Sequence, residues 1–198
     1  MKRSKNRWED HYSRQAKKDR FPARSVYKLQ EIQRKHTLIA PGDRVLDLGC
    51  SPGSWLLYAA ALTGKQGTVV GIDLKPVTVD LPKQVTVHTA DVLAMEAEHL
   101  ETLEKDFNVV LSDMAPATTG IKTVDAARSY GLCEAALSTA RYCLLPGGSF
   151  VCKIFQGQDF NQFDDLVKTV FENRKIFKPQ SSRKASREIY IIGIRKKK

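Results

Sequence analysis

Two segments of the chain carry side chains that could do proton chemistry at the end of a predicted strand. Residues 107–112 form an apolar run that leads into Asp113, and residues 150–155 form another with Lys153 inside it. Burying a lysine as a cation in an apolar strand is costly, so it must pair with an acid or lower its pKa. Either state suits a group that activates a hydroxyl. A purely structural ion pair between Asp113 and Lys153 is the alternative.

A glycine-containing turn after another apolar run predicts a cofactor loop. Residues 45–55 read VLDLGCSPGSW, in which a strand pattern stops at Gly49 and a helix-capable segment follows Gly53. Glycine lets the backbone approach a ligand, and the next helix offers its free N–H groups. The third glycine of the dinucleotide fingerprint is missing, which favours S-adenosylmethionine over a nicotinamide cofactor. A turn that needs glycine for steric reasons alone is the alternative.

Two further acids follow predicted strands. Asp73 closes the run 69–73, where nucleotide-binding α/β folds place a carboxylate that accepts hydrogen bonds from ribose hydroxyls. Asp91 follows the run 85–88. Both acids are expected at the same cleft, although an acid at a strand end can also serve as a helix N-cap.

If the cofactor is S-adenosylmethionine, the chemical group that accepts the methyl can be predicted by elimination. Methylation of a base amino group commonly uses an Asn/Asp-Pro-Pro-aromatic turn, and residues 113–116 lack the second proline and the ring. Carbon methylation of a pyrimidine needs a cysteine nucleophile, and strand alternation points Cys152 away from the face of Lys153. Of these acceptor types, a hydroxyl group remains as the predicted methyl acceptor.

Strand and helix patterns alternate along the chain. A helix is predicted over 23–37, which includes Lys28, and Pro146-Gly147-Gly148 is predicted to end a long helix. The other predicted elements are the strand in 45–48, strands near 68–72, 85–88, 107–112, 149–154 and 188–193, and helices over about 124–144 and 160–171. The order predicts an α/β fold with a mostly parallel sheet and helices on both faces. Ligands bind such sheets at the carboxyl ends of the strands, where Asp47, Asp73, Asp91, Asp113 and Lys153 all fall.

The 198 residues are expected to form a single domain, 1–198, with basic ends and an acidic centre. Residues 1–35 hold twelve Lys/Arg against four Asp/Glu, and residues 173–198 hold ten against one, although the whole chain carries only +10. This predicts a basic N-terminal arm and helix (about 1–37) and a basic C-terminal loop and tail that grip RNA or DNA. A solvated surface is the alternative.

Several classes of protein are disfavoured by the sequence. No run is long and apolar enough for a membrane span, and no apolar segment follows the basic start as in a secretory signal. The four cysteines, at 50, 133, 143 and 152, show no C-x-x-C pairing and no zinc spacing with histidine. We therefore expect a cytoplasmic protein without a metal, a disulfide or a membrane partner, and a monomer suffices.

Five ordered motifs resemble the FtsJ/RrmJ family of ribosomal-RNA ribose 2′-O-methyltransferases over nearly the whole chain. They lie at residues 24–32, 45–55, 112–116, 146–153 and 181–190. The chain departs from the family pattern at Cys50-Ser51 and at Ser54, and both departures keep small side chains.

This resemblance implies a Rossmann-like, S-adenosylmethionine-dependent fold with a seven-stranded sheet. It implies a catalytic tetrad in which Lys153 activates the hydroxyl, and the tetrad falls on Lys28, Asp113, Lys153 and Glu188. It also implies a cofactor site lined by Gly53, Trp55, Asp73, Asp91 and Asp113, although Trp55 could equally be a core aromatic. The implied substrate is the ribose of a uridine in the A loop of large-subunit ribosomal RNA, modified late in subunit assembly.

Three other functions stay open from the sequence. A nicotinamide-dependent oxidoreductase would explain Asp73 but not the missing glycine or the basic ends. A non-catalytic RNA-binding assembly factor would have kept the fold and lost the chemistry. A 2′-O-methyltransferase could also act on another RNA such as transfer RNA.

Overall fold

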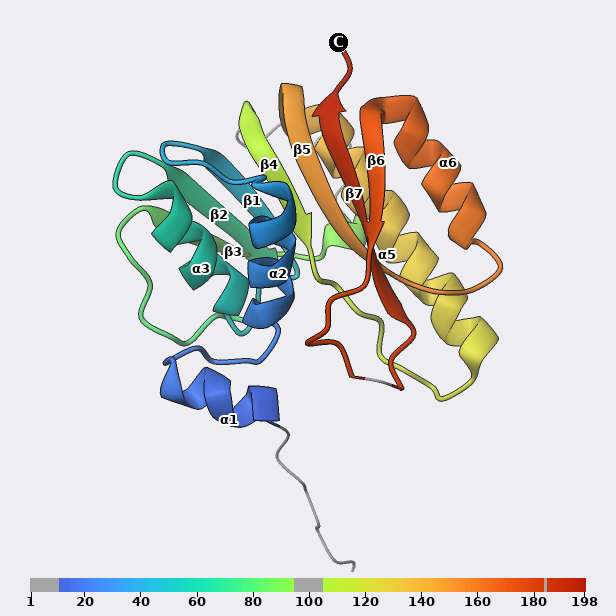
Figure 1. Ribbon diagram of the computed structural model, residues 1–198, viewed down its shortest axis with the longest axis horizontal. Helices are drawn as coiled ribbons and strands as arrows, with labels where there is room; N and C mark the ends of the chain where they lie inside the picture. Colours follow the sequence, from blue (N-terminus) through green and yellow to red (C-terminus); the bar gives the residue numbers. More distant parts are fainter. Residues whose placement is uncertain (1–10, 95–104, 184) are drawn as a thin grey trace, which may run out of the picture.

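The computed structural model describes residues 11–94, 105–183 and 185–198, and within them one sheet lies between two layers of helices (Figure 1). The strands of this sheet follow the order β3-β2-β1-β4-β5-β7-β6. Their bounds are β1 Arg44–Leu48, β2 Thr68–Asp73, β3 Val85–Thr89, β4 Phe107–Ser112, β5 Leu144–Phe155, β6 Phe171–Phe177 and β7 Glu188–Lys196. The expected α/β class, with a seven-stranded, mostly parallel sheet, is confirmed.

The first five strands are parallel, and β7 enters antiparallel between β5 and β6. Because β1 lies at the centre of the parallel part, Asp47 sits in register with Gly71 of β2 and Leu111 of β4. The carboxyl ends of the parallel strands therefore open at one edge of the sheet, where such sheets bind ligands.

Helices cover both faces of the sheet, as predicted (Figure 1). Their bounds are α1 His11–Lys18, α2 Val26–His36, α3 Ser54–Thr63, α5 Lys122–Cys143 and α6 Phe160–Val170, with a 3-10 turn at Val92–Ala94. Helices α2 and α3 contribute to one apolar core, and α5 and α6 to the other. In α2 the apolar positions Val26, Leu29 and Ile32 are all buried, which is the helical spacing that the sequence predicted. None of the described helices is long and apolar enough to cross a membrane.

Three details differ from the sequence prediction. Strand β6 was not predicted, because four of its seven residues are exposed and three are charged. Strand β5 begins at Leu144 and so includes the Pro146-Gly147-Gly148 segment, which was expected only to end the preceding helix. Helix α1 forms within the segment expected as a basic arm, and residues 1–10 of that arm lie outside the described residues.

Candidate active site

The four residues of the expected tetrad come together at the carboxyl ends of β4 and β5. Lys153 Nζ lies 3.0 Å from Asp113 Oδ1 and donates to the Asp113 main-chain carbonyl at 2.5 Å. Lys28 Nζ lies 2.8 Å from Glu188 Oε2 and 3.8 Å from Asp113 Oδ1. All four side chains are at most 14% exposed, so two cations and two carboxylates form one nearly buried, charge-balanced cluster.

Strand register explains how residues far apart in the sequence meet here. Lys153 of β5 pairs with Tyr190 of β7, and Phe155 pairs with Glu188, so the antiparallel insertion of β7 carries Glu188 to the end of β5. Because alternate residues of a strand face opposite sides, Cys152 points into the core beneath α5, away from the cluster, as the elimination of carbon methylation required.

Tyr190 is a member of this cluster that the sequence analysis missed. Its hydroxyl donates to Asp113 Oδ1 at 2.6 Å, and its side chain is fully buried. Burial, followed by the nearby Asp113 charge, raises the pKa of Tyr190 well above its ordinary value, so the phenol stays a donor. The alternation of Glu188 and Tyr190 on one face of the last predicted strand was the signal that could have identified it.

Asp113 is held ionised against the effect of its burial. Burial alone would raise its pKa, but the charges of Lys153 and Lys28 and the Tyr190 hydrogen bond together lower the pKa of Asp113 below its ordinary value. The carboxylate can therefore orient both lysine ammonium groups at one point. Such an arrangement can polarise or deprotonate a hydroxyl placed beside Lys153.

The predicted cofactor loop adopts a conformation that requires its glycines. Gly49 and Gly53 have φ angles of 78° and 106°. A Cβ atom at Gly53 would lie 2.9 Å from the side chains of Val77 and Val79, and one at Gly49 would overlap Met114. The Ser51-Pro52 peptide bond within the loop is cis. The loop is therefore a close-packed turn with its backbone facing the carboxyl ends of β1 and β2.

Asp73 lies beside this loop and Asp91 follows strand β3, and both have part of their hydrogen-bonding capacity in use. Asp73 accepts from the backbone N–H of Ser51 at 2.9 Å and of Lys75 at 2.8 Å, so it also fixes the loop. Asp91 accepts from the backbone N–H of Leu93 at 2.9 Å and caps the 3-10 turn, as the capping alternative proposed. Each carboxylate still has lone pairs that a ligand hydroxyl or amine could use.

Trp55 is buried and occupies the position of a core aromatic. It is 3% exposed, and its indole N–H donates to the Ser25 carbonyl at 2.8 Å. Ser54 also bonds the backbone of Ala23 in both directions, at 2.7 and 3.1 Å. The start of α3 is therefore fastened to the segment before α2, which links the cofactor loop to the helix that carries Lys28.

Asp47 is a buried acid under the cofactor loop with no hydrogen-bond partner among the described residues. It is 1% exposed, and both carboxylate oxygens lack a donor. Burial, followed by the charges of Asp113 and Asp73, raises the pKa of Asp47 well above its ordinary value. Asp47, Asp73 and Asp113 therefore lie close enough to influence one another, and a cationic ligand beside them would favour the ionised form of Asp47.

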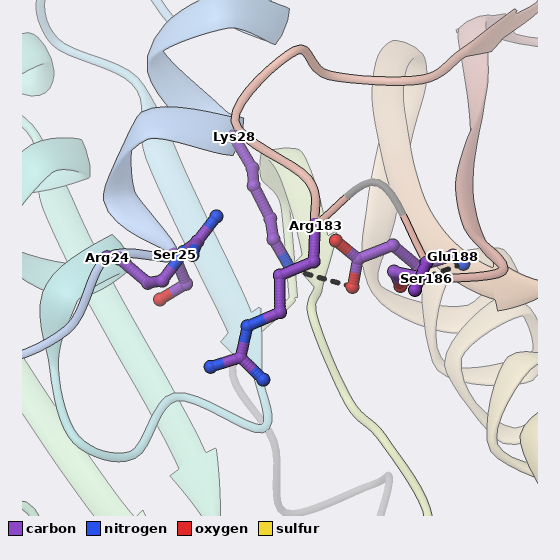
Figure 2. Close-up of a pocket in the computed structure, with 7 residues that line it drawn as sticks. Arg24, Ser25, Lys28, Arg183, Ser186 and Glu188 are labelled. Atoms are coloured by element: carbon purple, nitrogen blue, oxygen red, sulfur yellow. Dashed lines mark hydrogen bonds and ion pairs between the residues drawn. The ribbon is translucent and has the colours of Figure 1, made fainter. Parts of the chain in front are cut away.

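A cavity of about 510 Å³ opens beside the tetrad (Figure 2). Its lining residues are Arg24, Ser25, Lys28, Arg183, Ala185, Ser186 and Glu188. Figure 2 shows Lys28 reaching from α2 to Glu188, with Arg183 on the facing loop. Two of the lining residues are arginines, Arg24 and Arg183, and burial followed by the charge of Arg183 lowers the pKa of Arg24. A cavity with this lining suits an anionic chain such as a phosphodiester backbone.

The described residues contain no candidate metal-binding cluster. No group of three or more His, Cys, Asp or Glu residues in 11–94, 105–183 and 185–198 could hold a metal ion. The four cysteines are buried free thiols.

Comparison with known proteins gives consistent matches. The family model described as FtsJ-like methyltransferase matches residues 21–196. Ribosomal RNA large subunit methyltransferase E of Desulforapulum autotrophicum is 57% identical over 99% of this chain and 97% of its own length, and that of Bdellovibrio bacteriovorus is 47% identical over 95% and 97%. A crystal structure from Plasmodium falciparum, named as a ribosomal RNA methyltransferase, superposes with a TM-score of 0.78 at 25% identity and covers 89% of this chain and 98% of its own.

Proposed function

Because the chain belongs to the FtsJ-like methyltransferase family, we propose that it transfers the methyl group of S-adenosylmethionine to a ribose 2′-hydroxyl of large-subunit ribosomal RNA. The proposal includes a uridine of the A loop as the target, late subunit assembly as the stage, and a cytoplasmic monomer as the acting form. The observation that carries it is the buried cluster of Lys28, Asp113, Lys153 and Glu188 at the edge of a cationic cavity. The names of the curated relatives support the choice of RNA.

The residues around the cofactor loop fit S-adenosylmethionine. Gly53 supplies the positive φ that the loop conformation needs, and Asp73 and Asp91 would accept hydrogen bonds from the polar groups of the cofactor. The bound cofactor supplies an activated methyl group on a sulfonium cation together with the leaving group. Asp73 would place negative charge beside the sulfonium cation, and a bound cation would favour ionisation of the buried Asp47, whose pKa is otherwise raised. Trp55 would contribute by holding the loop against α2.

In the proposed mechanism the protein mainly aligns and activates the acceptor. Lys153 would lie against the 2′-hydroxyl, where its ammonium form would stabilise negative charge on the oxygen, and its amine form, after losing the ammonium proton to solvent, would take the hydroxyl proton. Asp113 orients Lys153 and keeps two lysines close together, and Tyr190 fixes Asp113 in turn. Glu188 holds Lys28.

Basic side chains of the cavity and of helix α1 would bind the RNA phosphates. Arg24 and Arg183 line the cavity, and Lys17 and Lys18 lie in the last turn of α1. Neutralised phosphates release counterions, so RNA binding should weaken steeply with salt.

The test is methyl transfer to a defined nucleotide. Labelled S-adenosylmethionine is incubated with large ribosomal subunits from a strain that lacks this protein, and the label is mapped. Resistance of one A-loop uridine linkage to alkali, lost with Lys153→Ala, is the expected result. Tight cofactor and subunit binding without transfer would instead indicate an assembly factor, and label on another RNA would reassign the substrate.

A further inference from the structure

Helix α2 fastens the β6–β7 loop (residues 178–187) through one carboxylate that the chemistry above does not use. Glu31 Oε2 accepts from the backbone N–H of Gln180 at 2.6 Å, and its Oε1 accepts from that of Ser181 at 2.8 Å. Arg24 donates to the carbonyl of Ser181 from the same side. Contacts across about 150 positions of sequence thus join α2 to this loop.

Lys28 and Glu31 lie three residues apart on α2 and therefore on neighbouring positions of one helix face. Glu31 fixes the first part of the loop, and Lys28 fixes the residue that follows the loop through its ion pair with Glu188. Both ends of the loop are therefore attached to the same helix, α2. Arg183 and Ser186, which line the cavity, lie between these two attachment points.

The attachment at Glu31 resolves a local hydrogen-bonding requirement. Ser181 and Ser182 are 0% and 8% exposed, so this part of the loop is buried although it has no regular secondary structure. The Glu31 carboxylate accepts from the N–H of Ser181 in this buried part and from that of the exposed Gln180 before it, and a charged acceptor makes the stronger kind of hydrogen bond. Without Glu31, the N–H of Ser181 would have to move to find another partner.

We propose that Glu31 is a positioning residue for RNA binding, which acts through the backbone of residues 180–181 to hold Arg183 at the cavity. Glu31 contacts the loop backbone and not the reacting atoms. Its carboxylate is negatively charged and would repel an RNA phosphate, so it does not bind the RNA itself. It acts on the affinity for RNA, whereas the tetrad acts on the methyl-transfer step. The inference rests on the proposed function, because RNA is the ligand that Arg183 would meet.

The test compares Glu31→Ala, Glu31→Gln, Arg183→Ala and the double variant Glu31→Ala/Arg183→Ala, with Glu172→Gln as a matched control. Glu172 is also a hydrogen-bonded carboxylate, but its donor is the side chain of Arg195 on the neighbouring strand and the site is exposed. Steady-state transfer to large subunits from the deficient strain gives KM and kcat for each. Thermal unfolding checks the fold, and hydrogen exchange reports on the backbone of residues 180–183.

Glu31→Ala should raise KM for subunits about tenfold with kcat within about twofold of wild type, the effect expected from losing charged hydrogen bonds. Glu31→Gln keeps one acceptor oxygen and should fall between. The double variant should match Arg183→Ala alone, since Glu31 acts through Arg183. Exchange at residues 180–183 should rise in Glu31→Ala, and the affinity for S-adenosylmethionine and the Glu172→Gln kinetics should not change.

Additive KM effects in the double variant, a fall in kcat instead of a rise in KM, or unchanged exchange at 180–183 would overturn the positioning role. Absence of transfer by the wild-type protein would refute the proposed function instead. In that case the hydrogen-exchange comparison still decides whether Glu31 holds the loop.

Discussion

Replacing Asp113 by asparagine should destabilise the protein by about 3 kcal/mol at pH 7. The change removes the carboxylate that Lys153 meets at 3.0 Å, Lys28 at 3.8 Å and the Tyr190 hydroxyl at 2.6 Å. Breaking a buried ion pair by removing one partner costs about 3–5 kcal/mol, because the other charge is left without compensation.

The lower end of that range applies because both lysines keep a partner in the variant. Lys28 retains Glu188 at 2.8 Å, and Lys153 still donates to the main-chain carbonyl of residue 113. For a chain of this length, 3 kcal/mol corresponds to a fall in Tm of roughly 6–12 °C. Glu172→Gln is the control, since its ion pair with Arg195 is exposed and should be worth no more than about 1 kcal/mol.

The pH dependence of this loss follows from the direction of the pKa shift. Burial opposes ionisation of Asp113, but Lys153 and Lys28 bring its pKa in the folded state below the ordinary 3.8. Its stabilising contribution is therefore full above pH 3.8 and disappears as the pH falls through the folded-state pKa. Denaturant unfolding of both proteins should show a constant difference from pH 5 to 8 and a smaller one below 3.8. Equal stability at pH 7, or a difference that changes between pH 5 and 8, would refute the reasoning.

Three further substitutions have defined outcomes. Lys153→Met should lower single-turnover methyl transfer by about 10²- to 10⁴-fold with S-adenosylmethionine affinity unchanged, and transfer within threefold of wild type would remove its assigned role. Gly53→Val should weaken S-adenosylmethionine binding at least about tenfold, because the φ angle of Gly53 is 106° and an added Cβ would meet Val77 and Val79. Calorimetry measures the affinity, and an affinity equal to that of the wild type would show that the loop does not need glycine here. The free energy of unfolding of Asp47→Asn should increase relative to that of the wild type as the pH rises above 3.8, because the raised pKa of Asp47 makes its ionisation unfavourable in the folded protein. Denaturation midpoints of the two proteins that differ by the same amount from pH 4 to 8 would contradict this prediction.

The central part of the fold was predictable because its signals are local. Strands β1, β2 and β4 are short, mostly apolar runs with an acid at or next to the carboxyl end, and α2 shows helical spacing of Val26, Leu29 and Ile32. Strand β6 was missed for a physical reason. It is an edge strand with exposed charged residues, and its stability comes from pairing with β7, which a single segment of sequence does not encode.

The residues of the candidate site were likewise only partly predictable from the sequence. Asp113 and Lys153 end or interrupt apolar runs, so their chemistry was visible before any fold was known. Glu188 and Lys28 were identified only through the family resemblance, because their meeting depends on the antiparallel insertion of β7 beside β5. Glu31 lies within the motif at residues 24–32 but was not singled out, since its partners are backbone N–H groups, which any residue type except proline supplies.

The insertion of β7 has a consequence for how the protein matures during synthesis. This strand is last in chain order, yet it lies between β5 and β6, and it carries both Glu188 and Tyr190. A nascent chain that has reached only residue 187 leaves the edge of β5 unpaired and cannot join β6 to the sheet. Translation therefore delivers the cofactor loop first and the complete tetrad last, so methyl-transfer competence should begin only when residues 188–196 have been released and folded into place.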